Sequence, residues 1–162
     1  MEPIRILFLC TGNSCRSQMA EGWAKFLHAG KIEAFSAGTQ PSRVNPLAIQ
    51  VMAEAGVDIS THRSKHLREF LGQRFDYVVT LCGDARDNCP VFPGASRMVH
   101  VGFPDPARAV GTPQEVLNEF RRVRDMIRDF VAGLPGTLAN ADPVHGGHLV
   151  STTSHVGSVS LE

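Results

Sequence analysis

Eight residues near the start of the chain bring a nucleophile and an anion clamp together, in the order Cys10-Thr11-Gly12-Asn13-Ser14-Cys15-Arg16-Ser17. They directly follow the apolar run 6–9, which predicts a buried strand, a tight loop and the start of a helix. Such a loop aims several backbone N–H groups at one point, and the helix N-terminus adds partial positive charge. We expect the loop from Thr11 to Ser17 to bind a tetrahedral oxyanion, with Arg16 as a two-pronged clamp and Cys10 as a nucleophilic thiolate.

A simpler interpretation makes Cys10 a buried free cysteine ahead of a helix cap. That interpretation explains neither Gly12 nor the spacing between Cys10 and Arg16. Cys15 lies inside the loop, and we expect its side chain to pack beneath the loop without a catalytic step.

Strand-like and helix-like segments alternate along the chain, which predicts an α/β fold with a four-stranded parallel sheet flanked by helices. The near-continuous apolar run 75–81 is typical of a strand buried on both faces. Thr112, Pro113 and Glu115 form a capping-box pattern that opens a long amphipathic helix, and Ser64 is expected to cap a short one. We predict strands at 4–9, 32–36, 75–81 and 97–103, and helices at 17–28, 46–54, 66–71 and from 113 to about 133.

Three chemically capable side chains follow three of these strands: Cys10, Cys82 and Asp105. Ligands of an open parallel sheet bind outside the carboxyl ends of its strands, so we expect these side chains to share one edge. Pro104 and Pro106 stiffen the loop around Asp105. Its carboxyl group could protonate an oxygen leaving the central atom of the oxyanion. Taken alone, Asp105 would be an ordinary turn residue.

Cys82 and Cys89 form a second notable pair. Their spacing is too wide for a zinc knuckle, and no nearby histidine pair completes a site, so we expect no metal. The two could be buried structural thiols. The interpretation that we favour is a resolving pair that carries oxidising equivalents away from Cys10.

The bulk composition narrows the class of protein. The length of 162 residues predicts one domain. The formal net charge of zero gives no excess of positive charge of the kind that binds nucleic acid or an anionic membrane. No apolar run is long enough to span a bilayer, and the N-terminus does not resemble a signal peptide. We therefore expect the thiols to work in a reducing cytoplasm.

The last part of the chain differs in kind. Residues 137–162 are rich in Gly, Ser, Thr and His, with few charges and no clear periodicity. We predict a catalytic α/β domain at 1–136 and a disordered tail at 137–162. The tail histidines have no carboxylate or cysteine beside them, so they are not expected to hold a metal.

The residues resemble a known family. The run Cys10 to Ser17 resembles the phosphate loop of the low-molecular-weight protein tyrosine phosphatase fold. With Cys82, Cys89-Pro90 and Asp105-Pro106-Ala107 added, the chain is similar to the thioredoxin-coupled arsenate reductases on that fold. The resemblance covers roughly residues 4–133, and it implies an enzyme of arsenical resistance and detoxification that needs no cofactor.

The resemblance implies a role for each matching residue. Cys10 would attack arsenate held by the loop, Asn13 would keep the loop's shape, and Ser17 would donate a hydrogen bond to the thiolate. Asp105 would protonate the departing oxygen. Cys82 would then attack Cys10 and release arsenite. Cys89 would attack Cys82, and thioredoxin would reduce the resulting disulfide.

The sequence departs from that family at one place. Relatives of this type often bind a potassium ion beside the loop. Asn13, Glu21 and Ser36 are present here, but Arg63 and Lys65 stand at the later positions, so we expect no cation site.

Two other functions stay open. A phosphotyrosine phosphatase usually carries an aromatic residue after the Asp-Pro pair, where this chain has Ala107. A non-catalytic thiol redox sensor is the alternative from another class.

Overall fold

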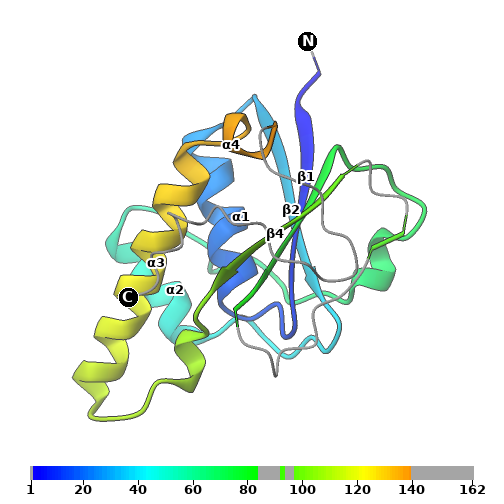
Figure 1. Cartoon of the computed structure of the whole chain (residues 1–162). Coiled ribbons are helices and arrows are strands. Elements are labelled where there is room, and N and C mark those ends of the chain that lie inside the picture. The colour runs from blue at the N-terminus through cyan, green and yellow to red at the C-terminus, as the bar shows by residue number, and fades with distance from the viewer. Residues whose placement is uncertain (1, 84–91, 94–96, 140–162) are drawn as a thin grey trace.

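A computed structural model describes residues 2–83, 92–93 and 97–139 of the chain (Figure 1). The elements alternate between strand and helix, as the sequence pattern predicts. Along the chain they are β1 (Ile4–Cys10), α1 (Arg16–Leu27), β2 (Ile32–Gly38), α2 (Pro46–Glu54), η1 (Leu67–Phe70), β3 (Tyr77–Cys82), β4 (Met98–Phe103), η2 (Pro106–Arg108), α3 (Pro113–Ala132) and α4 (Gly136–Ala139), where η marks a 3₁₀ helix.

The four strands form one parallel sheet in the order β2-β1-β3-β4. The predicted four-stranded parallel sheet is therefore confirmed. Because β1 lies between β2 and β3, the chain first adds β2 on one side of β1 and then crosses back to add β3 and β4 on the other side. This reversal of strand order is the place where open α/β sheets bind ligands. It lies at the carboxyl end of β1, where Cys10 is located.

Both faces of the sheet are covered, which explains why β1 is apolar and buried from Ile6 to Cys10. Helices α1, α2 and α3 lie on one face (Figure 1), and Ile6 and Phe8 pack there against residues of these helices such as Trp23. Leu7 and Leu9 point to the opposite face. That face packs against Phe70 of η1, Phe75 and Phe92.

Of the two helix caps predicted from the sequence, one is present and the other is not. The predicted capping box of α3 is present, because the Thr112 hydroxyl accepts from Glu115 N at 3.1 Å and Glu115 Oε1 accepts from Thr112 N at 2.8 Å. The prediction that Ser64 caps the short helix is wrong. His66 caps η1, with its Nδ1 accepting from Arg68 N at 2.9 Å. Ser64 instead donates its hydroxyl to the carbonyl oxygen of Gly12.

The described domain extends beyond the predicted boundary at residue 136. Helix α4 continues to Ala139, and Leu138 is only 1% exposed in the main core. Apolar burial of Leu138 therefore holds the first residues of the predicted tail against the domain. The rest of that segment, 140–162, lies outside the described residues.

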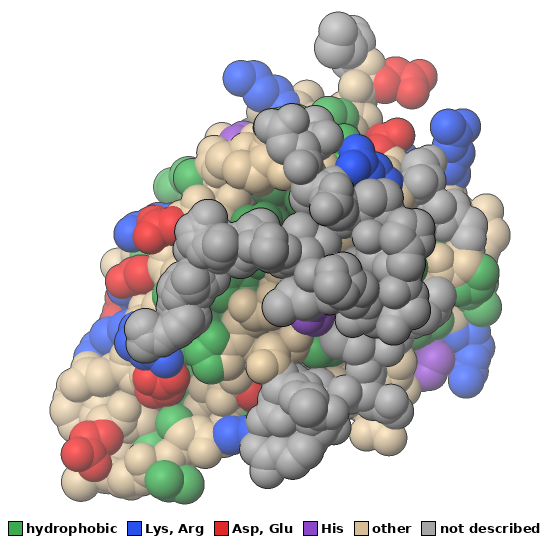
Figure 2. All heavy atoms as spheres, in the orientation of Figure 1, with side chains coloured by type: hydrophobic (Ala, Val, Ile, Leu, Met, Phe, Trp, Pro, Cys, Tyr) green, Lys and Arg blue, Asp and Glu red, His purple; other side chains and the backbone are tan. Residues whose placement is uncertain are grey.

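The surface mixes charges of both signs. In Figure 2 acidic and basic side chains alternate along the outer side of α3, where Arg122 pairs with Glu119 at 2.7 Å and Arg128 lies 3.7 Å from Asp125. Within the described ranges, no helix has both the length and the apolar character to cross a bilayer.

Candidate active site

The segment between β1 and α1 is a loop with its carbonyl groups turned outward. The carbonyl oxygens of Thr11, Gly12 and Ser14 accept backbone N–H groups of residues 40, 42 and 45 at 2.9, 3.3 and 3.0 Å. A trans peptide unit points its N–H away from its carbonyl oxygen. The amides that follow these carbonyls therefore face the inside of the loop. Together with the N-terminus of α1 they make a cradle for an anion.

Asn13 holds the loop in shape. It is fully buried and has a φ of 47°, a left-handed conformation that asparagine tolerates better than most residues. Its Oδ1 accepts the backbone N–H of Lys65 at 2.8 Å, which fixes the orientation of the amide group. The opposite end, Nδ2, consequently donates to Ser17 Oγ at 2.8 Å.

The hydroxyl of Ser17 connects Asn13 to Cys10. Ser17 Oγ lies 3.2 Å from Cys10 Sγ. Asn13 Nδ2 can only donate, so it occupies an acceptor site of the Ser17 oxygen and leaves the hydroxyl hydrogen free. That hydrogen is therefore available to Cys10 Sγ, and a hydroxyl donor at this position would stabilise a thiolate. Cys10 itself is 2% exposed at the end of β1.

Arg16 connects the loop to the end of β4, the edge strand of the sheet. Its side chain is almost fully buried, and Nη1 donates to the carbonyl oxygen of Phe103 at 3.2 Å. Its Nη2 lies 3.5 Å from Asp105 Oδ2. The guanidinium thus stands between the anion loop and the predicted acid.

Asp105 follows β4 and is held by its own turn. Oδ1 accepts from Ala107 N at 3.0 Å and caps η2. Oδ2 faces Arg16 and lies 3.7 Å from Arg108 Nε. The turn-residue interpretation and the acid interpretation are therefore compatible, because one oxygen serves the turn and the other faces the loop.

The two further described thiols have different surroundings. Cys82 is 2% exposed at the end of β3, which neighbours β1, and it pairs in register with Phe103. Cys15 is buried as predicted, and burial raises the pKa of its thiol to about 12. Cys15 therefore stays protonated at neutral pH. Cys89 lies outside the described residues.

Gly38, at the end of β2, has to be a glycine for the loop to close. A Cβ at this position would lie 2.4 Å from the carbonyl oxygen of Thr11 and 2.8 Å from that of Cys10. Backbone atoms cannot yield in the way that a flexible side chain can. The close approach of β2 to the loop therefore depends on the missing side chain.

The comparison with protein families agrees with this geometry. Residues 5–143 match the family described as low molecular weight phosphotyrosine protein phosphatase. The chain belongs to that family.

Several known proteins resemble the chain closely. An arsenate reductase of Halalkalibacterium halodurans is 52% identical over 122 residues, which cover 75% of this chain and 88% of the relative. A solved arsenate reductase in the phosphate binding state has a TM-score of 0.71 and 37% identity, covering 83% of this chain and 98% of the other. A thioredoxin-dependent arsenate reductase of Corynebacterium glutamicum has a TM-score of 0.55 and 26% identity, covering 80% and 62%.

Some residues of this phosphatase-family site escaped the sequence analysis. Gln18 is fully buried, and its Nε2 donates to Asn13 Oδ1 at 3.0 Å and to the carbonyl oxygen of Arg63 at 3.0 Å. Gln18 Oε1 in turn accepts a hydrogen bond from His62 Nδ1 at 2.9 Å. Neither residue carried a signal in the sequence, because Gln18 lies off the apolar stripe formed by Ala20, Trp23, Ala24 and Leu27, and its burial appears only in the fold.

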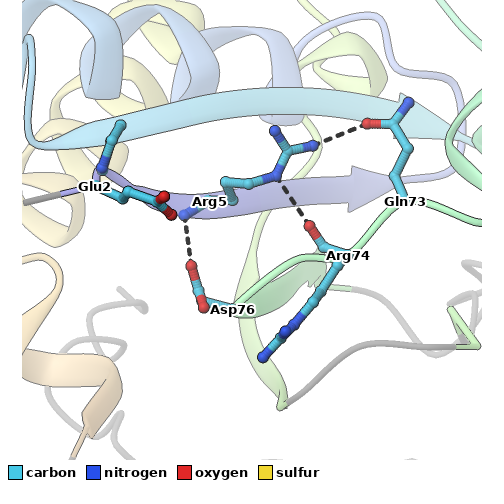
Figure 3. A pocket seen from close by; sticks show the side chains of 6 residues that line it. Glu2, Arg5, Gln73, Arg74 and Asp76 are labelled. Atoms are coloured by element: carbon cyan, nitrogen blue, oxygen red, sulfur yellow. Dashed lines mark hydrogen bonds between the residues drawn. The ribbon is translucent and has the colours of Figure 1, made fainter.

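A separate hollow of about 410 Å³ lies at the other end of β1 (Figure 3). Arg5 lines it and donates Nε to the carbonyl oxygen of Arg74 at 2.9 Å and Nη2 to Gln73 Oε1 at 2.8 Å. The same guanidinium lies 4.7 Å from the centre of the Phe35 ring. These hydrogen bonds connect β1 to the segment before β3, and they occupy N–H donors of Arg5 that could otherwise bind a ligand. We therefore assign this hollow a structural role.

Proposed function

We propose that this chain is an arsenate reductase in which Cys10 is the nucleophile and Cys82 and Cys89 form the disulfide relay. The observation that carries the proposal is Cys82, a second buried thiol at the end of the strand next to β1. Phosphate ester hydrolysis needs one cysteine, whereas reduction needs a source of two electrons. The similarity to proteins named arsenate reductase supports the same choice.

The first step uses the loop and Asp105. Arsenate binds to the inward N–H groups and Arg16, and the Cys10 thiolate forms an S–As bond. One oxygen of arsenate leaves as water, with its proton supplied by the Asp105 carboxyl group. Arsenic is still As(V) after this step, because only a ligand has been exchanged.

The second step moves two electrons. Cys82, as a thiolate, attacks Cys10 Sγ and forms a Cys10–Cys82 disulfide. The electron pair of the S–As bond goes to arsenic, which leaves as arsenite, As(III). Cys89 then attacks Cys82, which frees the Cys10 thiolate and leaves a Cys82–Cys89 disulfide.

The last step needs a dithiol reductant. We propose thioredoxin, supported by the likeness to a relative named thioredoxin-dependent. Two electrons and two protons from its dithiol return Cys82 and Cys89 to thiols. This chemistry fits a reducing cytoplasm, where a disulfide is transient and catalytic.

Trapping the disulfides tests the proposal. Cys89→Ser enzyme, mixed with arsenate without reductant, should release one arsenite per chain and accumulate a Cys10–Cys82 disulfide that peptide mass spectrometry detects. Cys82→Ser enzyme should release none. If Cys89→Ser turned over continuously with thioredoxin as the sole reductant, the relay would be wrong. Hydrolysis of an aryl phosphate without arsenate reduction would instead favour a phosphatase.

A further inference from the structure

A buried carboxylate lies behind the anion loop. Glu21 of α1 is 5% exposed. Its Oε1 accepts from Ser36 Oγ at 2.5 Å, and its Oε2 meets the ammonium of Lys25 at 2.5 Å. Lys65 Nζ lies 3.9 Å from Oε1. A carboxylate at this depth is costly unless positive charge and hydrogen bonds compensate it.

Lys65 belongs to a short segment that supports the loop, here called the buttress (residues 63–65). Each of its residues contacts the loop, its helix or the end of β2. The backbone contacts are Lys65 N to Asn13 Oδ1 at 2.8 Å, Gly38 N to Lys65 O at 2.9 Å and Gln18 Nε2 to Arg63 O at 3.0 Å. The side chain of Ser64 adds a bond to Gly12 O at 3.0 Å.

The ammonium of Lys65 closes this arrangement. Its side chain is 13% exposed, and Nζ donates to the carbonyl oxygen of Arg63 at 2.7 Å while facing Glu21. Arg63 turns its own guanidinium outward, where it pairs with the Glu69 carboxylate at 2.8 Å. The Lys65 ammonium thus lies between the carbonyl oxygen of Arg63 and the buried carboxylate of Glu21. Carbonyl and carboxylate oxygens are the ligands that hard metal cations prefer.

These residues do not fit a bound potassium ion. The Glu21 carboxylate already faces two ammonium groups, from Lys25 and Lys65, and a third positive charge would be repelled.

We propose that Lys65 is a positioning residue whose ammonium replaces a bound monovalent cation. It ties the buttress to Glu21 and thereby holds the backbone N–H that fixes the Asn13 amide. Asn13 in turn sets the direction of the Ser17 hydrogen bond to Cys10. The covalently attached ammonium of Lys65 therefore keeps the Ser17 hydroxyl oriented toward Cys10 without a bound potassium ion. The geometry of the site carries this inference, and it rests on the proposed function only in assigning Cys10 as the nucleophile.

Removing and then restoring the cation tests this inference. The full chain is compared with Lys65→Gln by two measurements that do not require arsenate. One is the rate at which iodoacetamide alkylates Cys10, read by peptide mass spectrometry. The other is the melting temperature in potassium, ammonium or choline chloride at equal ionic strength. Choline is too large to enter the space that the lysine leaves.

In Lys65→Gln we expect Cys10 alkylation to slow by about tenfold, the lower end of what indirect partners of a site contribute. Potassium or ammonium, but not choline, should restore part of the rate and raise the melting temperature. The unaltered chain should respond equally to all three salts. Lys65→Arg should keep most of the rate, since it retains the charge.

Lys25→Gln is the matched control. Lys25 also pairs with Glu21, but its side chain is 50% exposed and it lies on α1 rather than on the buttress. Its loss should change Cys10 alkylation less than twofold. The inference is overturned if Lys65→Gln alkylates at the normal rate, if no small cation restores it, if Lys25→Gln slows it equally, or if potassium stabilises the unaltered chain. Arsenate turnover plays no part, so a wrong substrate assignment would leave these results intact.

Discussion

Replacing Ser17 with alanine should slow the first chemical step without unfolding the protein. In the structure the Asn13 amide donates to Ser17 Oγ at 2.8 Å, and Ser17 Oγ lies 3.2 Å from Cys10 Sγ. Ser17→Ala removes the donor to the thiolate and also leaves the Asn13 amide without that acceptor. A hydrogen bond to a charged group contributes about 1.5–3 kcal/mol, which corresponds to a rate loss of roughly 10- to 150-fold.

The assay is a single turnover in the absence of reductant. Reduced enzyme is mixed with excess arsenate, quenched in acid at set times and analysed for released arsenite and protein disulfide. Ser14→Ala is the control, because it removes a hydroxyl from the same loop that contacts Cys15 at 3.9 Å rather than Cys10. We expect at most a few-fold loss for this control. Urea unfolding of each variant separates a slower reaction from a damaged fold.

A second substitution tests the direction of the hydrogen-bond chain. Asn13→Gly removes the amide but tolerates the φ of 47°. If Asn13 acts on Cys10 through Ser17, Asn13→Gly should cost less rate in the Ser17→Ala background than in the unaltered chain. Additive losses, or a Ser17→Ala rate within twofold of normal, would refute the reasoning.

Three further predictions concern Asp105, the half-buried His62 and the glycine after β3. Asp105→Asn should slow formation of the arsenic–sulfur intermediate roughly a hundredfold, as for a lost general acid, with little change in phosphate binding; an unchanged single-turnover rate would remove Asp105 from the mechanism. Burial lowers the pKa of His62 from its usual 6.5, so the unfolded chain binds this proton more readily. The free energy of unfolding should therefore decrease as the pH falls below about 6.5, and less so in His62→Gln; equal losses would contradict this. Gly83→Ala would bring a Cβ to 2.1 Å from the carbonyl oxygen of Phe103, which holds Arg16, so phosphate should no longer protect Cys10 from alkylation. Gly136→Ala, where a Cβ meets nothing within 4 Å, should leave that protection intact.

Local patterns were sufficient to predict most of the fold. Helix α2 has the predicted bounds, and the capping box of α3 is formed as expected, because both depend on residues close in sequence. The strand predicted at 75–81 instead runs from Tyr77 to Cys82. Its start was misplaced because Phe75 is buried against η1 and β2 but lies outside β3, and apolar content alone cannot separate these cases.

The site was predictable where one short motif contains it. The spacing from Cys10 to Ser17 indicated the loop, and the strand-end rule brought Cys82 and Asp105 to the same edge. What could not be predicted depends on contacts between distant residues. Ser64 was expected to cap a helix, but its hydroxyl is used by Gly12, which lies 52 positions away in the sequence. The side-chain role of Gln18 likewise depends on the placement of the buttress.

In the proposed mechanism two electrons reach arsenate through Cys10, Cys82 and Cys89. The most direct test follows NADPH oxidation by thioredoxin reductase and thioredoxin in the presence of arsenate and this chain. We predict sustained oxidation that depends on arsenate and stops when Cys10, Cys82 or Cys89 is replaced by serine. An enzyme that consumes no NADPH with arsenate, yet hydrolyses an aryl phosphate through Cys10, would contradict the account.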